Sequence, residues 1–485
     1  MEIKKNLLKE LEEIHSLMLK AEVQKSKQIK TVHSHYRHSA INLVDYLALR
    51  SQNVETLQNQ LHNLGLSSLA SSESHIKRQV AKVIEWLGEK DVPHKIVPEI
   101  GLKELLQNIT DLFGKSGKDE APPIMVTFDT NFIEDFQMIC DLLENGMKLA
   151  RINCAHDDEP TWIKMIENLE KAKEKMNLPC KLYMDIAGPK IRTQIIGNKN
   201  KKEKIKVDLG DEIILTDKKN VTKAKKFIQC TQPGIVENLK LGHRVFFDDG
   251  LFEAVVQRCV RNEAVLKITR VSTNKPFIKS EKGINFPDTT FQINPITEYD
   301  LKCLPFIVKH ADMVGFSFVN NSNDMDQLQV QLVRLNKPNL PIIAKIETNQ
   351  AVNHLPDIIL QGMKQNLTGI MIARGDLAVE IGFERMSEIQ DEILWICEAA
   401  HTPVIWATQV LESMNKDGLA TRSEVTDAAH SADADCVMIN KGGHTVEVLK
   451  TLNNILTKSR KNNFKNRRLF RKLSIAHNFF SDRKT

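Results

Sequence analysis

Hydrophobic residues in the first part of the chain recur at every third or fourth position. With polar residues between them, this spacing predicts amphipathic helices over residues 5–20, 44–64 and 75–87. A stretch rich in Lys, Gly, Ser and Pro at residues 115–123 is typical of a linker. We therefore expect an N-terminal α-helical domain over residues 1–114.

Beyond the linker the pattern changes to short apolar runs separated by helix-length stretches. Eight runs predict strands at residues 124–128, 148–154, 181–186, 313–318, 342–346, 369–372, 404–407 and 436–439. Eight strands alternating with helices indicate an α/β fold, a parallel (β/α)₈ or TIM barrel, with a doubly wound open sheet as the alternative. A closed barrel brings many strand ends to one face, and polar residues at five strand ends favour it. They are Arg151, Asp185, Lys345, Glu347, Asp376 and Thr408.

The segment between the third and fourth strands departs from this alternation of strands and helices. Residues 193–285 are rich in Lys and Val and contain short alternating runs, such as 210–216 and 244–250. They predict a small β domain inserted at the catalytic face, a position that suits a lid excluding water from a reaction. The barrel would then comprise residues 124–192 and 286–457.

Composition and cysteine spacing indicate the cellular compartment of the protein. A hydrophobic content of 41% with 27% charged residues is ordinary for a soluble globular protein. The longest apolar runs fall far short of the roughly 20 residues of a membrane span. The first residues lack the apolar stretch of a secretory signal, and the eight cysteines show no paired spacing. We expect a cytoplasmic protein without a membrane partner.

The positive charge is concentrated at the C-terminal end. The net charge is +5, yet residues 458–485 alone hold ten Lys or Arg and one Asp. The rest of the chain is therefore slightly negative. We expect a solvated basic tail over residues 458–485. Nucleic-acid binding is not expected, because few aromatic residues are interleaved with these charges.

Two adjacent apolar runs end in residues that suit metal chemistry. One closes on Lys345-Ile346-Glu347 and the next on Ala373-Arg374-Gly375-Asp376. Two carboxylates with few other ligands suit Mg²⁺ (or Mn²⁺), which keeps positions open for phosphate and carboxylate oxygens. A lysine beside such a metal can neutralise charge on a phosphoryl group or an enolate. The pattern predicts metal-assisted chemistry on a small anionic substrate.

Six segments resemble, in the same order, the signature motifs of the pyruvate kinase family. They are residues 150–156, 185–192, 248–251 with 282–285, 345–350, 373–380 and 407–414. The resemblance covers roughly residues 123–456. It implies transfer of the phosphoryl group of phosphoenolpyruvate to ADP with Mg²⁺, to give ATP and pyruvate in glycolysis.

The resemblance also implies roles for individual residues. Glu347 and Asp376 would hold the metal, and Lys345 would stabilise the transferring phosphoryl group and the enolate oxygen. Thr408 would deliver a proton to the enolate carbon, while Gly375 and Asp376 open a helix that binds the substrate carboxylate. Arg151 and Arg192 would clamp phosphate oxygens. The implied nucleotide-binding residues are Arg151, Asn153, His156, Arg192, Asp249 and Lys282.

The sequence departs from the family pattern at the monovalent-cation site. Lys190 stands where many members have Glu, and Ala155 and Ile186 replace the Ser and Thr that help to hold K⁺. We expect the Lys190 ammonium, beside Asn153 and Asp185, to supply the charge that K⁺ otherwise provides. Activity should then need no monovalent cation.

Other departures concern the nucleotide side and the ends of the chain. The segments 128–129, 320–321 and 440–443 differ from the family motifs. The resemblance ends after the eighth strand, so we expect the C-terminal regulatory domain, and control by sugar phosphates, to be absent. We expect the N-terminal helices to mediate self-association into a homo-oligomer, because an amphipathic helix must bury its apolar face.

Two other functions remain open. The chain could be a catalytically weakened binding or regulatory protein that keeps the substrate pocket. It could also be a metal-dependent lyase acting on enolpyruvate or a 2-keto acid with the same barrel. The inserted domain, with Asp249 and Lys282, favours a nucleotide and speaks against the lyase.

Overall fold

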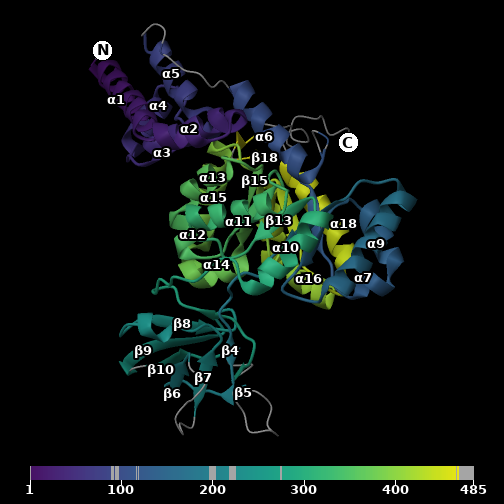
Figure 1. The fold of residues 1–485 in the computed structure, drawn as a ribbon. Coiled ribbons are helices and arrows are strands. Elements are labelled where there is room, and N and C mark those ends of the chain that lie inside the picture. Colours follow the sequence, from purple (N-terminus) through teal and green to yellow (C-terminus); the bar gives the residue numbers. More distant parts are fainter. Residues whose placement is uncertain are drawn as a thin grey trace, which may run out of the picture.

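The computed structural model has three parts in a row, a helical part, a barrel and a β domain (Figure 1). It describes residues 2–88, 92, 98–115, 117, 120–195, 204–217, 226–260, 262–272, 276–461, 463–465 and 467–468. The predicted linker at 115–123 therefore lies partly outside the described residues.

The middle part is a closed barrel of eight parallel strands. Its strands are β1 (Ile124–Thr127), β2 (Met147–Asn153), β3 (Lys181–Asp185), β13 (Met313–Phe316), β14 (Ile342–Ile346), β15 (Thr368–Ala373), β16 (Val404–Ala407) and β17 (Cys436–Ile439). β1 pairs with both β2 and β17, which closes the ring and excludes the open sheet. Parallel strands covered on both faces are apolar throughout, which explains the continuous apolar runs in the sequence. The predicted fold class is confirmed.

Helices surround the barrel, most of them between successive strands (Figure 1). They are α7 (Asn131–Glu134), α8 (Phe136–Glu144), α9 (Glu159–Met176), α10 (Glu298–His310), α11 (Ser322–Arg334), α12 (Asn349–Asn353), α13 (Leu355–Gly362), α14 (Arg374–Ile381), α15 (Met386–Ala399), α16 (Glu412–Asp417), α17 (Arg422–His430) and α18 (Thr445–Arg460). Among the described residues, no helix combines the length and apolarity that crossing a membrane requires. Of the predicted basic tail, residues 469–485 lie outside the described part.

The N-terminal part consists of α1 (Glu2–Gln24), α2 (Ser26–Thr31), α3 (Arg37–Arg50), α4 (Glu55–Asn63), α5 (Ile76–Trp86) and α6 (Pro98–Phe113). The single helix predicted over residues 44–64 is wrong, because the chain turns between α3 and α4. Asn53 accepts a hydrogen bond from the backbone N–H of Glu55 at 3.1 Å, which satisfies a donor at the start of α4.

The helical part packs onto the barrel by two routes. Leu112 and Phe113 of α6 join the cluster of side chains inside the barrel, and Leu112 lies against Gly369 near the start of β15. The helix α6 therefore fills the end of the barrel where the strands begin. The apolar faces of α1, α3 and α5 pack on one another and on Ala399 of α15.

This packing removes the reason for expecting self-association. The apolar face of α1, including Leu7, Leu11 and Met18, is buried within the chain. The homo-oligomer itself stays a prediction.

A buried polar cluster fixes the same contact between the helical part and the barrel. His401, fully buried after α15, bonds Ser39 at 2.9 Å and the carbonyl of Ser74 at 2.9 Å, and it lies 3.2 Å from Glu104. A Cβ on Gly101 would stand 2.3 Å from the Ser74 carbonyl oxygen, so only glycine fits there. His401 thus belongs to this packing contact and not to a site.

The third part is the inserted β domain, which leaves the barrel after β3 and returns before α10. Its strands are β4 (Thr193–Gln194), β5 (Lys204–Lys206), β6 (Glu212–Thr216), β7 (Phe227–Cys230), β8 (Arg244–Phe247), β9 (Phe252–Val260), β10 (Glu263–Arg270), β11 (Phe277–Lys279) and β12 (Ile284–Asn285). Seven of them form one sheet in the order β12-β8-β9-β10-β6-β7-β4. This domain has its own apolar core and is called the lid domain below.

Candidate active site

The site lies where the barrel strands end, beneath the lid domain. A cavity of about 390 Å³ opens there, and we call it the catalytic cavity. Its polar lining residues are Arg151, Asn153, His156, Lys190, Arg192, Asp249, Ser317, Lys345, Glu347, Asp376, Thr408, Gln409, Glu412 and Asn440.

Lys345, at the end of β14, is the buried cation of the cavity. Its Nζ lies 3.1 Å from Asp185 Oδ2 and 3.2 Å from Glu347 Oε1, and it donates to Ser317 Oγ at 2.7 Å. Burial alone would lower the pKa of Lys345, but the carboxylates of Glu347 and Asp185 hold it above its usual value. Lys345 is therefore a charged ammonium group held in one place.

Arg151, at the end of β2, shares Asp185 with this lysine. Its Nη2 donates to Asp185 Oδ2 at 2.9 Å and its Nη1 to Thr127 Oγ1 at 3.1 Å. Asp185 is fully buried beneath the cavity and does not line it. The carboxylate of Asp185 thus orients two cations that face the cavity.

The opposite wall is the start of α14. The backbone N–H of Gly375 donates to Thr408 Oγ1 at 2.9 Å, and Asp376 follows in the first turn of the helix. Thr408 has a φ of 65°, which a β-branched residue rarely adopts. Such strain persists where the surrounding structure enforces it, often at functional sites. The Thr408 hydroxyl accepts from Gly375 and keeps its own proton to donate.

Lys190 reaches across the cavity from the segment after β3. Its Nζ lies 2.8 and 3.0 Å from the two carboxylate oxygens of Asp376. Asp300 accepts from the backbone N–H of Ala187 at 2.9 Å and so fixes the segment that carries Lys190. The structure therefore places the Lys190 ammonium beside Asp376 and not, as predicted, beside Asn153 and Asp185.

The lid side contributes fewer groups than the sequence predicts. Asp249 lines the cavity, and burial raises its pKa although Lys190 opposes this. Arg192 also lines it and donates to the carbonyl of Glu281 at 3.0 Å. Lys282 stays outside the lining and pairs with Asp248 at 2.8 Å.

Glu347 and Asp376 are the two carboxylates that fit a divalent metal. Burial raises the pKa of Glu347, Lys345 opposes the rise, and the negative charge of Asp376 adds to it. The two carboxylates therefore repel each other. The Lys190 ammonium on Asp376 offsets part of this repulsion, and a divalent metal held by both carboxylates would offset more of it. Oxygen ligands of this number fit Mg²⁺, which keeps other positions for substrate and water. Among the described residues, no group of three or more His, Cys, Asp or Glu forms a fuller metal site.

Sequence reasoning missed two supporting residues. Ser317 accepts from Lys345 and donates to the carbonyl of Ile186 at 2.7 Å. It follows β13 directly, so the rule that polar residues at strand ends form the site would have found it. Asp300 lies in the first turn of α10, where it forms a capping box with Thr297. This capping role explains the residue in the sequence and gives no sign of its second contact, with the N–H of Ala187.

The comparisons agree with this geometry. Residues 123–446 match the model of the family described as pyruvate kinase, barrel domain. The pyruvate kinase of Bacillus licheniformis is 31% identical over 333 residues, covering 67% of this chain and 55% of that protein. The pyruvate kinase of Geobacillus stearothermophilus is 30% identical over 329 residues, covering 66% and 54%. The chain thus spans about half the length of these curated relatives. It belongs to the pyruvate kinase family.

Proposed function

We propose that this protein transfers the phosphoryl group of phosphoenolpyruvate to a nucleoside diphosphate, with ADP as the expected acceptor. The observation that carries the proposal is the arrangement around Lys345. Its ammonium group is held between Asp185, Glu347 and Ser317, on the same cavity as Asp376 and Thr408. A fixed cation facing two carboxylates and a hydroxyl suits a reaction in which a phosphoryl group leaves and an enolate remains.

The substrate would lie between Lys345 and the start of α14. The N–H groups at this helix start favour an anion, and here they would hold the carboxylate of phosphoenolpyruvate. Arg151 would face the phosphate oxygens with the planar guanidinium that Asp185 orients. The substrate is then positioned before the nucleotide arrives, which lowers the entropic cost of reaction.

In the transfer step, a terminal phosphate oxygen of the nucleotide attacks the phosphorus of phosphoenolpyruvate. The bond between phosphorus and the enol oxygen breaks, and its electron pair stays on that oxygen as an enolate. The Lys345 ammonium offsets the charge on the transferring group and then on the enolate oxygen. A divalent metal held by Glu347 and Asp376 would supply Lewis-acid charge compensation to the same oxygens when bound.

In the second step the enolate gains a proton at its terminal carbon and becomes pyruvate. We assign delivery of this proton to Thr408, directly or through a water molecule. The hydroxyl is positioned for this because Gly375 donates to its oxygen and leaves its proton available. The strained backbone of Thr408 directs the side chain into the cavity.

The nucleotide would occupy a neighbouring cavity of about 350 Å³. This cavity shares Arg151, Asn153 and His156 with the catalytic cavity and adds Lys416 and Lys441. Burial lowers the pKa of His156, and the positive charge of Lys441 lowers it further. Three cations in this lining, Arg151, Lys416 and Lys441, outnumber its two carboxylates, Asp157 and Glu412. The remaining positive charge suits the phosphates of a nucleoside diphosphate.

A pyruvate-forming assay tests the proposal. Wild-type protein receives phosphoenolpyruvate, Mg²⁺ and ADP, GDP, CDP or UDP in turn, and we expect pyruvate with at least one of them. Lys345→Met should lower turnover by about 100-fold or more, because it removes the charge that stabilises the enolate. Lys416→Met, at the rim of the nucleotide cavity, is the matched control and should mainly raise the KM for the nucleotide.

Other outcomes would favour the remaining functions. Binding of phosphoenolpyruvate that depends on Mg²⁺, without turnover, would indicate a binding or regulatory protein. Pyruvate released from a 2-keto acid without any nucleotide would indicate a lyase. We also propose a cytoplasmic location, because the eight cysteines are all free thiols, as is usual in a reducing compartment.

A further inference from the structure

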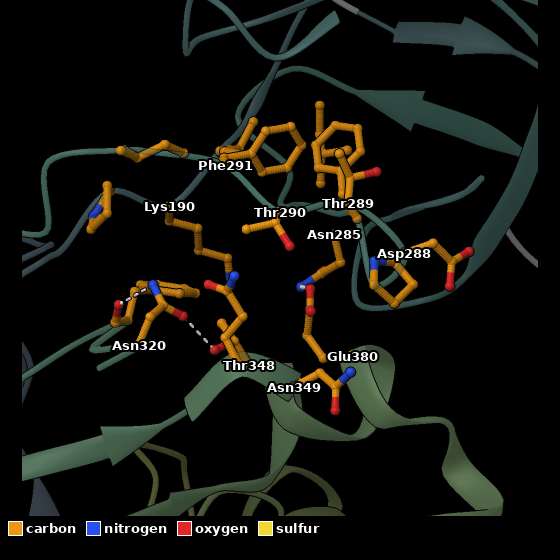
Figure 2. A pocket seen from close by; sticks show the side chains of 18 of the residues that line it. Lys190, Asn285, Asp288, Thr289, Thr290, Phe291, Asn320, Thr348, Asn349 and Glu380 are labelled. Atoms are coloured by element: carbon orange, nitrogen blue, oxygen red, sulfur yellow. Dashed lines mark hydrogen bonds between the residues drawn. The ribbon is translucent and has the colours of Figure 1, made fainter. Parts of the chain in front are cut away.

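A third cavity, of about 300 Å³, lies at the hinge between the lid domain and the barrel. We call it the hinge cavity, and Figure 2 shows it from close by. It borders the catalytic cavity, because Lys190 and Phe318 line both. Most of its polar lining consists of neutral side chains, among them Thr290, Asn320 and Asn349.

Glu380 is the unusual group in this lining. Three charged residues line the hinge cavity, and two of them have partners of opposite charge. Lys190 pairs with Asp376 at 2.8 Å, and Asp288 pairs with Arg244 at 2.7 Å. Within the described part of the chain, Glu380 forms no salt bridge. A salt bridge therefore does not explain why a carboxylate occupies this position.

Glu380 has a hydrogen-bond partner on the lid side of the hinge. Asn285 Nδ2, at the last residue of the lid strand β12, donates to Glu380 Oε1 at 3.1 Å. Figure 2 shows the Asn285 side chain pointing toward Glu380. This hydrogen bond thus joins the lid to α14.

A second contact of the lid rests on the same helix. A Cβ on Gly250 would lie 3.5 Å from Val379 Cγ2 and 3.6 Å from Phe383, so the turn that carries Asp249 lies against α14 and the residues after it. Arg270 holds this turn by donating to the carbonyl of Gly250 at 2.8 Å. The lid therefore touches α14 at two points, and the same helix carries Asp376 in its first turn.

We infer that Glu380 is a positioning residue that fixes the angle of the lid domain relative to the substrate-binding helix α14. Without the acceptor oxygen of Glu380, the lid residue Asn285 loses its hydrogen bond to α14. The lid would then sample a wider range of angles, and Asp249 would be held less closely over the cavity. The effect that we predict on catalysis rests on the proposed function, whereas the effect on the lid angle does not.

The distance between lid and barrel tests the inference without any activity. Cys259 on β9 is the exposed cysteine among the eight, and the other seven are buried. It can carry one spin label, and Ser387→Cys, an exposed position on α15, can carry the second. Pulsed electron spin resonance then gives the distribution of distances between lid and barrel in the full chain.

We expect Glu380→Ala to widen this distribution by about twofold, because hinge motions are limited by a few contacts. Glu380→Gln keeps an acceptor oxygen for Asn285 and should restore the narrow distribution. The matched control is Glu384→Ala, an exposed carboxylate on the segment after α14, which should leave the distribution unchanged. Asn285→Ala removes the same contact from the lid side and should reproduce Glu380→Ala, which covers the case in which Glu380→Ala does not fold.

Distributions as narrow as that of the wild type in both Glu380→Ala and Asn285→Ala would overturn the inference. If the pyruvate-forming assay shows turnover, Glu380→Ala should lower that turnover by about tenfold, because Asp249 is then held less closely over the catalytic cavity. Absence of turnover in the wild type would contradict the proposed function and leave the distance measurement unaffected.

Discussion

The Glu380→Gln substitution gives a prediction whose size follows from the structure. Burial raises the pKa of Glu380 from 4.5 to about 7, with Asp376 adding to the rise and the hydrogen bond from Asn285 opposing it. In the unfolded chain the carboxyl has its ordinary pKa. Folding therefore favours the protonated form, and folding stability falls as the pH rises from the unfolded to the folded pKa.

The magnitude comes from the difference between the two pKa values. One pKa unit corresponds to 1.36 kcal/mol, so the full shift is worth roughly 3 kcal/mol. The carboxyl also borders the hinge cavity, where water screens it. We therefore expect an observed effect between roughly 1 and 3 kcal/mol. Glutamine has nearly the same shape and no charge, so the variant lacks this pH-dependent loss.

Urea unfolding at several pH values measures this effect. The emission of the buried Trp162 and Trp406 reports on the barrel. The free energy of unfolding of Glu380→Gln relative to wild type should be smallest below pH 4.5 and should rise until about pH 7, then remain constant. Glu384→Gln, at an exposed position, should show no such rise. A difference between Glu380→Gln and wild type that does not change with pH would refute the reasoning.

Three further predictions concern the site and the barrel. Thr408→Val should lower kcat by about 100-fold with little change in the KM for phosphoenolpyruvate, because it removes the proposed proton donor, and steady-state kinetics at saturating nucleotide measure this. Replacing K⁺ by tetramethylammonium should change turnover less than twofold in wild-type protein, since we expect the Lys190 ammonium, which pairs with Asp376, to supply the charge that K⁺ otherwise provides; a several-fold loss would contradict this role. Tyr183→Phe should raise the free energy of unfolding by about 1 kcal/mol or more, because the Tyr183 hydroxyl is buried in the barrel and has no hydrogen-bond partner among the described residues; a loss of stability would show that the hydroxyl has one.

The barrel and the main site residues could be predicted because both follow from local rules. Strands covered on both faces appear as continuous apolar runs, and the polar residue after each run lies at the same face of the barrel. Lys345, Glu347, Asp376 and Thr408 therefore meet in one cavity although they come from three strands.

The remaining features depend on contacts that local patterns do not contain. Lys190 bonds Asp376, which is 186 residues away in sequence, and Asn285 bonds Glu380 across 95 residues. Each contact joins segments that only the tertiary fold brings together. Lys282 was assigned to the nucleotide by resemblance, and its ion pair with Asp248 within the lid domain likewise requires the folded turn.

The most direct test of the account follows both products of the transfer in one sample. Phosphorus-31 nuclear magnetic resonance of wild-type protein with phosphoenolpyruvate, Mg²⁺ and ADP should show the phosphoenolpyruvate signal falling as the γ-phosphate signal of ATP rises in equal amount. Pyruvate, followed by proton nuclear magnetic resonance in the same sample, should form in the same proportion. Lys345→Met should slow all three changes by about 100-fold or more. Loss of phosphoenolpyruvate to free phosphate, or equal transfer by Lys345→Met, would contradict the role of the buried ammonium group.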